Sequence, residues 1–180
     1  MELSFALHSP DLERERPLEP AMMKDALLRA MEAARDPSGS SGAVPWRFYL
    51  LGMETISAVA WLYARLLEGE VGAEGARAAY EQWRAVPGWI VVTCVRQADE
   101  ERMERAVEDC LTSVQRCTLS LWSDNVPTNW VTDLISESDE LYDLIQVDPE
   151  QEKVLGILWY GHPDRPSRGG FSSDEFQERP

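Results

Sequence analysis

The residues between Pro37 and Phe48 are the part of this sequence whose side-chain types and spacing most favour ligand binding. The stretch PSGSSGAVPWRF holds three serines and two glycines and ends in a Trp-Arg-Phe run. Short hydroxyls and loop N–H groups can hydrogen-bond a polar ligand, and glycine lets the backbone come close to it. The alternative interpretation is a helix-ending turn that leads Trp46 and Phe48 into the core.

Side chains for self-contained acid–base, nucleophilic or metal chemistry are sparse. The chain has two histidines, His8 and His162, and it lacks a Gly-x-Ser-x-Gly elbow, a His-Glu-x-x-His motif and a Walker loop. Cys94, Cys110 and Cys117 lack paired metal-ligand spacing and are typical of small apolar core residues. The sequence therefore predicts no metal site and identifies no catalytic side chain, so any chemistry would come from a bound cofactor.

Length and charge limit the function classes. The chain has 180 residues, with 17 Lys and Arg against 32 Asp and Glu, for a formal net charge of −15. This charge disfavours nucleic acid and anionic membrane surfaces as partners, because both require clustered cations. No signal peptide or membrane span is recognisable, so a cytoplasmic location is expected. We expect one domain over 1–180, with an N-terminal arm at 1–19 and a flexible tail at 169–180.

Hydrophobic periodicity predicts helices and a few strands that do not strictly alternate, which is typical of the α+β class. The expected helices cover 20–35, 54–68, 73–84, 99–123 and 138–146, and the expected strands cover 46–53, 88–95 and 153–161. The strand at 88–95 is apolar throughout and should be buried on both faces. The longest helix, 99–123, carries an apolar stripe and should end where Asn125 and Pro127 follow it.

Four segments resemble the nitroreductase family in their order and rough spacing, over residues 20–168. PSGSSGAVPWRFYLL (37–51) is similar to the family's flavin loop, Pro-Ser-x-x-Asn-x-Gln-Pro-Trp-x-Phe, and WRAVPGWIVVTC (83–94) to its next strand. CLTSVQRCTLSLWSDNVPTNWVTD (110–133) resembles the central helix with its Gly-Ile-Gly-Thr-x-Trp turn, and KVLGILWYGHPDRP (153–166) the closing strand and its exit. The resemblance implies a homodimeric three-layer α/β/α fold with a mixed, mostly antiparallel sheet.

The resemblance also implies a site for FMN. The serine loop would meet the ribityl chain and ring edge, and the backbone after the central helix would lie along a ring face. Arginines near both ends would hold the phosphate, because a chain of this negative charge repels a dianion unless cations are placed locally. The implied cofactor-binding residues are Arg14, Arg16, Ser38, Gly39, Ser40, Ser41, Pro127, Thr128, Arg165 and Arg168.

The sequence departs from the family pattern at several of these positions. Val44 stands where the family has Gln, the loop Asn is replaced by Ser or Gly with one residue inserted, and the N-terminal arginine motif is not recognisable. Asn125 and Pro127 replace the glycines of the turn. Each lost hydrogen bond is worth about 0.5–1.5 kcal/mol, so several losses would weaken flavin binding by orders of magnitude.

The activity implied by the resemblance is that of an FMN-dependent oxidoreductase. NAD(P)H would transfer hydride to flavin N5, and a nitroaromatic, quinone or similar acceptor would then be reduced in a ping-pong cycle. The family builds this site across a homodimer interface, and the stripe on helix 99–123 fits either a dimer seam or a core helix.

Two alternatives remain open at the level of sequence. One is a non-catalytic dimer that keeps the fold and has lost or weakened flavin binding. The other is a branch that cleaves flavin or dehalogenates its substrate, with 66–83 as a substrate lid.

Overall fold

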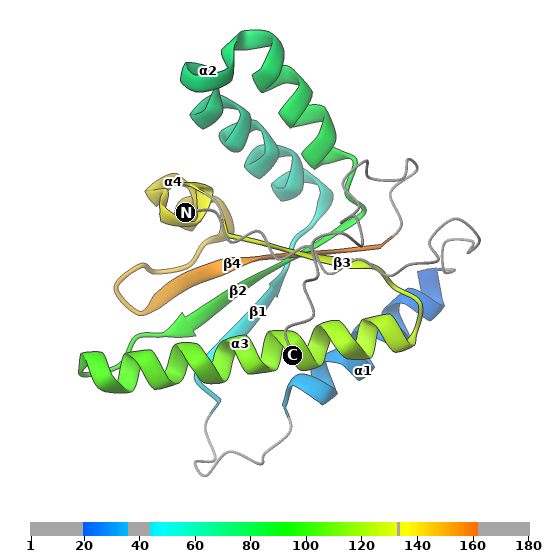
Figure 1. Cartoon of the computed structure of the whole chain (residues 1–180), viewed down its shortest axis with the longest axis vertical. Helices are drawn as coiled ribbons and strands as arrows, with labels where there is room; N and C mark the ends of the chain where they lie inside the picture. Colours follow the sequence, from blue (N-terminus) through cyan, green and yellow to red (C-terminus); the bar gives the residue numbers. More distant parts are fainter. Residues whose placement is uncertain (1–19, 36–43, 133, 162–180) are drawn as a thin grey trace, which may run out of the picture.

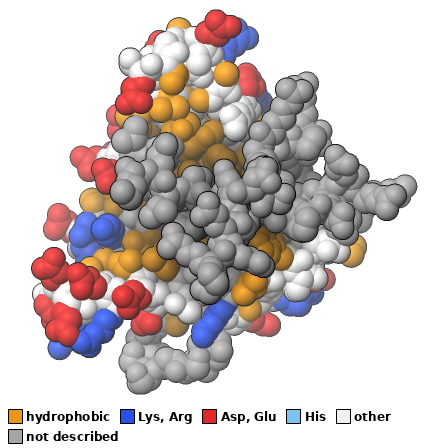
Figure 2. All heavy atoms as spheres, in the orientation of Figure 1, with side chains coloured by type: hydrophobic (Ala, Val, Ile, Leu, Met, Phe, Trp, Pro, Cys, Tyr) orange, Lys and Arg blue, Asp and Glu red, His pale blue; other side chains and the backbone are white. Residues whose placement is uncertain are grey.

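The computed structural model describes residues 20–35, 44–132 and 134–161, which form three layers with helices on both faces of one sheet (Figure 1). Within these residues no helix combines the length and apolar character needed to cross a bilayer. Acidic side chains gather at the tip of the longest helical element and along one lower edge of the face in Figure 2.

The sheet has the strand order β1-β2-β4-β3, and all three strand pairs are antiparallel. The strands are β1 (Trp46–Leu50), β2 (Gly88–Val95), β3 (Thr128–Val131) and β4 (Glu152–Tyr160). β2 lies in the middle and is buried along nearly its whole length, as its apolar run predicts. A register shift between Val92 and Thr93 marks an irregularity against β4.

One face of the sheet is covered by α1 (Pro20–Ala34) and α3 (Glu100–Ser123). The apolar stripe of α3 packs against α1 and against alternate residues of β1, β2 and β4, with Cys110, Cys117 and Leu121 fully buried. Trp46 belongs to this cluster and stacks on Phe48 with ring centroids 4.5 Å apart. The stripe therefore builds the core of a single chain, and of the two interpretations of the stripe the core helix is the one observed.

The opposite face is covered by α2 (Met53–Arg84), the 3-10 turn η1 (Leu134–Glu137) and α4 (Asp139–Ile145). α2 forms two helical arms that meet at Gly72, whose φ of 74° lies in the left-handed region that glycine adopts at little cost. Trp83, at the end of α2, stacks on Tyr63 and meets Trp89 and Trp159 edge to face. This aromatic cluster fixes the base of the two arms on the sheet.

The expected elements are present, with three differences. The loop expected between the helical segments at 54–68 and 73–84 is helical, and only Gly72 interrupts it. β3 was not expected, because a four-residue strand after a helix-ending turn shows too little periodicity to be recognised. The expected strand at 46–53 ends at Leu50, since Met53 already begins α2.

Cys117 should make stability fall at alkaline pH. Burial raises the pKa of this thiol to about 12, whereas an unfolded cysteine titrates near about 8.5. Below the unfolded pKa the thiol is protonated in both states. As pH rises from there toward the folded pKa, the unfolded chain loses the proton first, and the free energy of unfolding falls by about 1.4 kcal/mol per pH unit. Between about pH 9 and 11, the free energy of unfolding measured with urea should therefore fall more steeply with pH for the wild type than for Cys117→Ala. Parallel profiles would contradict this.

Candidate functional site

The end of α3 holds the residues that the sequence predicted to lie along a flavin. Asn125 adopts φ 58°, and the N–H groups of Asn125 and Val126 bond to the carbonyls of Trp122 and Leu121 at 2.9 and 2.8 Å. These are the two bonds of a Schellman motif, completed by the buried contact side chains Leu121 and Val126. Asn125 thus supplies the left-handed backbone for which the family pattern uses glycine.

Pro127 and Thr128 follow this turn and are fixed by two further bonds. The Pro127 carbonyl accepts from the Gly161 N–H at 3.0 Å, which ties the turn to the end of β4. The Thr128 hydroxyl accepts from the Trp122 Nε1–H at 2.9 Å, which ties the start of β3 to the last turn of α3. Both residues are partly exposed, so a rigid backbone is presented at the surface.

Two other chain segments meet at the same end of the sheet. Thr128 and Gly88 are both register partners of Tyr160, so the starts of β2 and β3 flank the end of β4. A Cβ on Gly88 would meet the Tyr160 ring at 2.2 Å, which shows that this ring lies directly over the glycine. Burial raises the pKa of the Tyr160 phenol and keeps it protonated at neutral pH.

Arg29 and Asp124 link α1 to this region. The Arg29 Nε donates to Asp124 at 3.1 Å, and a second guanidinium nitrogen lies 2.9 Å from the other carboxylate oxygen. A two-point pair of this kind fixes the angle of the guanidinium as well as its position. Trp122, Tyr160 and this ion pair were not recognised from sequence, because no local pattern reveals a contact between α3 and α1 or between β2 and β4.

The opposite end of the sheet contains a buried carboxylate. Glu152, 4 % exposed, accepts hydrogen bonds from the Arg47 guanidinium and the Thr93 hydroxyl, and from the Tyr49 hydroxyl at 3.0 Å. Burial raises the pKa of Tyr49. Hydrogen bonding to Tyr49 and the charge of Glu152 raise the pKa of Arg47. This network joins β1, β2 and β4 just after the serine-rich stretch enters the sheet.

The two ends of the sheet are well separated. Trp46 pairs with Cys94, whereas Thr128 lies at the Gly88 end, so six residue steps of β2 separate them, or about 20 Å. Pro127 and Thr128 are the predicted site residues that the structure describes. Eight others lie outside the described residues: Arg14, Arg16, Ser38, Gly39, Ser40, Ser41, Arg165 and Arg168.

Val44, where the family pattern has Gln, is 50 % exposed and offers no side-chain hydrogen bond. Trp46 and Phe48, the aromatic end of the same motif, are core residues. The part of this motif that the structure describes therefore contributes packing rather than polar groups.

Several solved structures have the same fold. A nitroreductase-like family protein from Bacillus cereus superposes with a TM-score of 0.68 at 15% identity, covering 92% of this chain and 88% of that one. An iodotyrosine deiodinase bound to FMN and 3-iodo-L-tyrosine gives a TM-score of 0.64 at 17% identity, covering 92% and 91%.

The FMN- and NADPH-dependent nitroreductase NfnB from sphigopyxis sp. strain HMH gives a TM-score of 0.56 at 14% identity, covering 93% and 92%. No curated protein matches the chain. The model of the nitroreductase family matches residues 18–162. With the three-layer fold and the Schellman turn before Thr128, this match shows that the chain belongs to the nitroreductase family.

Proposed function

We propose that this protein is an FMN-dependent oxidoreductase that takes hydride from NAD(P)H and reduces a nitroaromatic, quinone or similar acceptor. Family membership over residues 18–162 carries the proposal. Structural neighbours that contain FMN, and one described as NADPH-dependent, support it. When bound, the flavin would accept two electrons as hydride at N5 and pass them on to the acceptor.

The turn at Pro127 and Thr128 fits a flavin in its backbone shape. Asn125 keeps the positive φ of a glycine, and the bonds to Gly161 and Trp122 leave the turn little freedom to move when a ligand docks. Pro127 has no N–H, so one backbone donor of the family's turn is absent. In the proposed site, Pro127 and Thr128 would line the ring, Ser38, Ser40 and Ser41 its edge, and Arg14, Arg16, Arg165 and Arg168 the phosphate.

We further propose that each site is built by two copies of the chain. The serine loop enters the sheet at the Trp46 end, about 20 Å along β2 from Thr128. One flavin touching both is easier to accommodate when the loop comes from a partner subunit. α1 and α3, the two helices that cover one face of the sheet, also carry exposed large apolar side chains, namely Met22, Leu28 and Leu111. Their exposure is consistent with association of two chains through these helices.

The first test is the visible absorption spectrum of the purified protein and its titration with FMN. Saturable binding at about one FMN per chain, and bleaching by NADH or NADPH under nitrogen, are expected. Thr128→Val removes the acceptor of Trp122 Nε1–H and should weaken FMN binding about fivefold, as for one hydrogen bond of about 1 kcal/mol. Thr132→Val, at an exposed neighbouring threonine, is the matched control.

A colourless protein that does not bind FMN at millimolar concentration would overturn the oxidoreductase proposal and leave the flavin-free dimer as the alternative. If FMN binds, a nitroaromatic, a quinone and an iodinated phenol should be compared as acceptors. The iodinated phenol is included because a deiodinase is among the structural neighbours. Turnover of that compound alone would replace the proposed acceptor class.

The two-chain site is tested by complementation. A chain with Ser38, Ser40 and Ser41 changed to alanine and a chain with Arg165 and Arg168 changed to alanine should each bind FMN poorly. Refolded together, they should recover about a quarter of the sites, because half of randomly formed dimers are mixed and each mixed dimer has one intact site. If mass measurement shows that mixed dimers form but FMN binding is not recovered, the serines and arginines of each site would come from one chain.

A further inference from the structure

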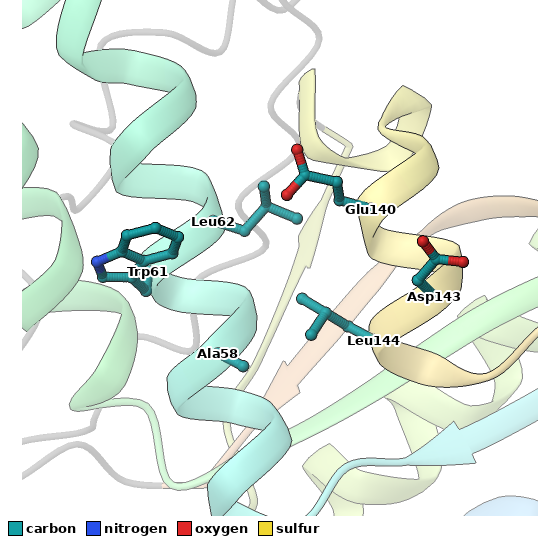
Figure 3. Close-up of a pocket in the computed structure, with 6 residues that line it drawn as sticks. All are labelled: Ala58, Trp61, Leu62, Glu140, Asp143 and Leu144. Atoms are coloured by element: carbon teal, nitrogen blue, oxygen red, sulfur yellow. The ribbon is translucent and has the colours of Figure 1, made fainter.

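The groove between α2 and α4 has an apolar floor and a charged rim (Figure 3). It has a volume of about 370 Å³ and is lined by Ala58, Trp61, Leu62, Glu140, Asp143 and Leu144. Leu62 and Leu144 point toward one another from the two helices, and Leu62 is 1 % exposed. Leu62 therefore closes the bottom of the groove, whereas the side formed by Trp61 is open to solvent, since this residue is 57 % exposed.

A guanidinium already lies at the rim of this groove. Arg65, one helical turn beyond Trp61, places its guanidinium carbon 5.0 Å from the centroid of the Trp61 ring and forms an ion pair with Glu140. An indole face with a carboxylate beside it is the combination that attracts an organic cation. Arg65 thus shows that a guanidinium fits over Trp61 and beside Glu140.

The negative charge around the groove exceeds what Arg65 neutralises. η1 and α4 together contribute Glu137, Asp139, Glu140 and Asp143, and neither element contains Lys or Arg. Asp143 lines the groove and is exposed. On a chain of net charge −15, these carboxylates attract a cation and repel an anion.

We propose that this groove is a binding site for a small organic cation, a guanidinium with a short apolar chain. The alkyl chain would lie against Ala58 and Leu144, which line the groove and are both partly exposed, and the guanidinium would replace that of Arg65 over Trp61 and beside Glu140. Arg65 is an internal competitor that is easily displaced, because its pair with Glu140 is at the surface, with the two side chains 41% and 60% exposed. Asp143 adds a second, exposed carboxylate at the rim of the groove.

The test is calorimetric titration of the full chain with butylguanidinium and, in parallel, with butylurea. The two compounds have the same shape and the same apolar chain, and only the first is charged. We expect saturable binding of butylguanidinium at one site and no measurable binding of butylurea. Arg65→Ala should tighten binding up to about fivefold, because it removes the competing guanidinium.

Trp61→Ala should weaken binding about two- to fivefold through loss of the ring face, and Glu140→Gln with Asp143→Asn should weaken it at least as much. The matched control is Glu104→Gln with Glu108→Gln, which removes the same charge from the exposed surface of α3 and should leave affinity unchanged. Circular dichroism verifies that each variant is folded.

Three outcomes would overturn the proposal. They are equal binding of butylurea, loss of affinity in the α3 control equal to that of the α4 variant, and absence of binding even for Arg65→Ala. Because FMN carries no guanidinium, none of these results depends on whether the chain binds flavin.

Discussion

Replacing Glu152 with alanine should lower the free energy of unfolding by about 2–4 kcal/mol, because a buried carboxylate with several donors is lost. Its oxygens accept from Thr93, Tyr49 and Arg47, and these donors come from two other strands. The Thr93 hydroxyl is completely buried and would lose its partner, whereas Arg47 is exposed and would turn to water. The loss of stability therefore arises mainly in the interior, where Thr93 of β2 contacts β4.

Urea unfolding followed by circular dichroism measures this change. Glu150→Ala is the matched control, since it removes an exposed carboxylate two residues away and should change stability by less than about 0.5 kcal/mol. Glu152→Gln keeps the shape and one acceptor oxygen, so it should be less destabilising than alanine. Equal midpoints for Glu152→Ala and Glu150→Ala would show that the network contributes nothing.

Gly156→Ala should lower the free energy of unfolding by about 1–3 kcal/mol through overpacking. A Cβ at Gly156 would lie 2.6 Å from the Trp130 ring and 2.7 Å from the Val131 carbonyl oxygen. A backbone oxygen cannot rotate away, so β3 would have to shift against β4. Since β3 begins at Thr128, FMN binding should also fall if the proposed function is correct.

Gly69→Ala is the matched control for this substitution. Gly69 lies inside α2, and nothing lies within 4 Å of the position that an added methyl group would occupy, so alanine should stabilise the helix by about 0.5–1 kcal/mol. Opposite signs for the two glycines in thermal unfolding are the expected result. A neutral or stabilising Gly156→Ala would mean that the contact with Trp130 and Val131 relaxes without cost.

Much of the fold could be predicted from the sequence alone, because its long segments have a clear hydrophobic pattern. The stripe of α3 and the continuous apolar run of β2 each repeat over enough residues to outweigh local ambiguity, and both elements are observed within a residue of the expected bounds. The end of α3 was also predictable, because Asn readily adopts the left-handed conformation that closes a helix and Pro127 cannot extend it. Family membership followed from four short motifs in the right order.

Only the tertiary structure decided what those segments contact. The same stripe on α3 is compatible with a dimer seam and with a core helix, and within the single chain it is buried against α1 and the sheet. β3 is stabilised by pairing with β4, since its own four residues show no strand pattern. The bonds from the Thr93 hydroxyl to Glu152 and from the Gly161 N–H to Pro127 join residues far apart in the sequence, which strand pairing brings together. Periodicity reports which side of an element is buried, whereas the partner across the interface is set by the packing of the whole chain.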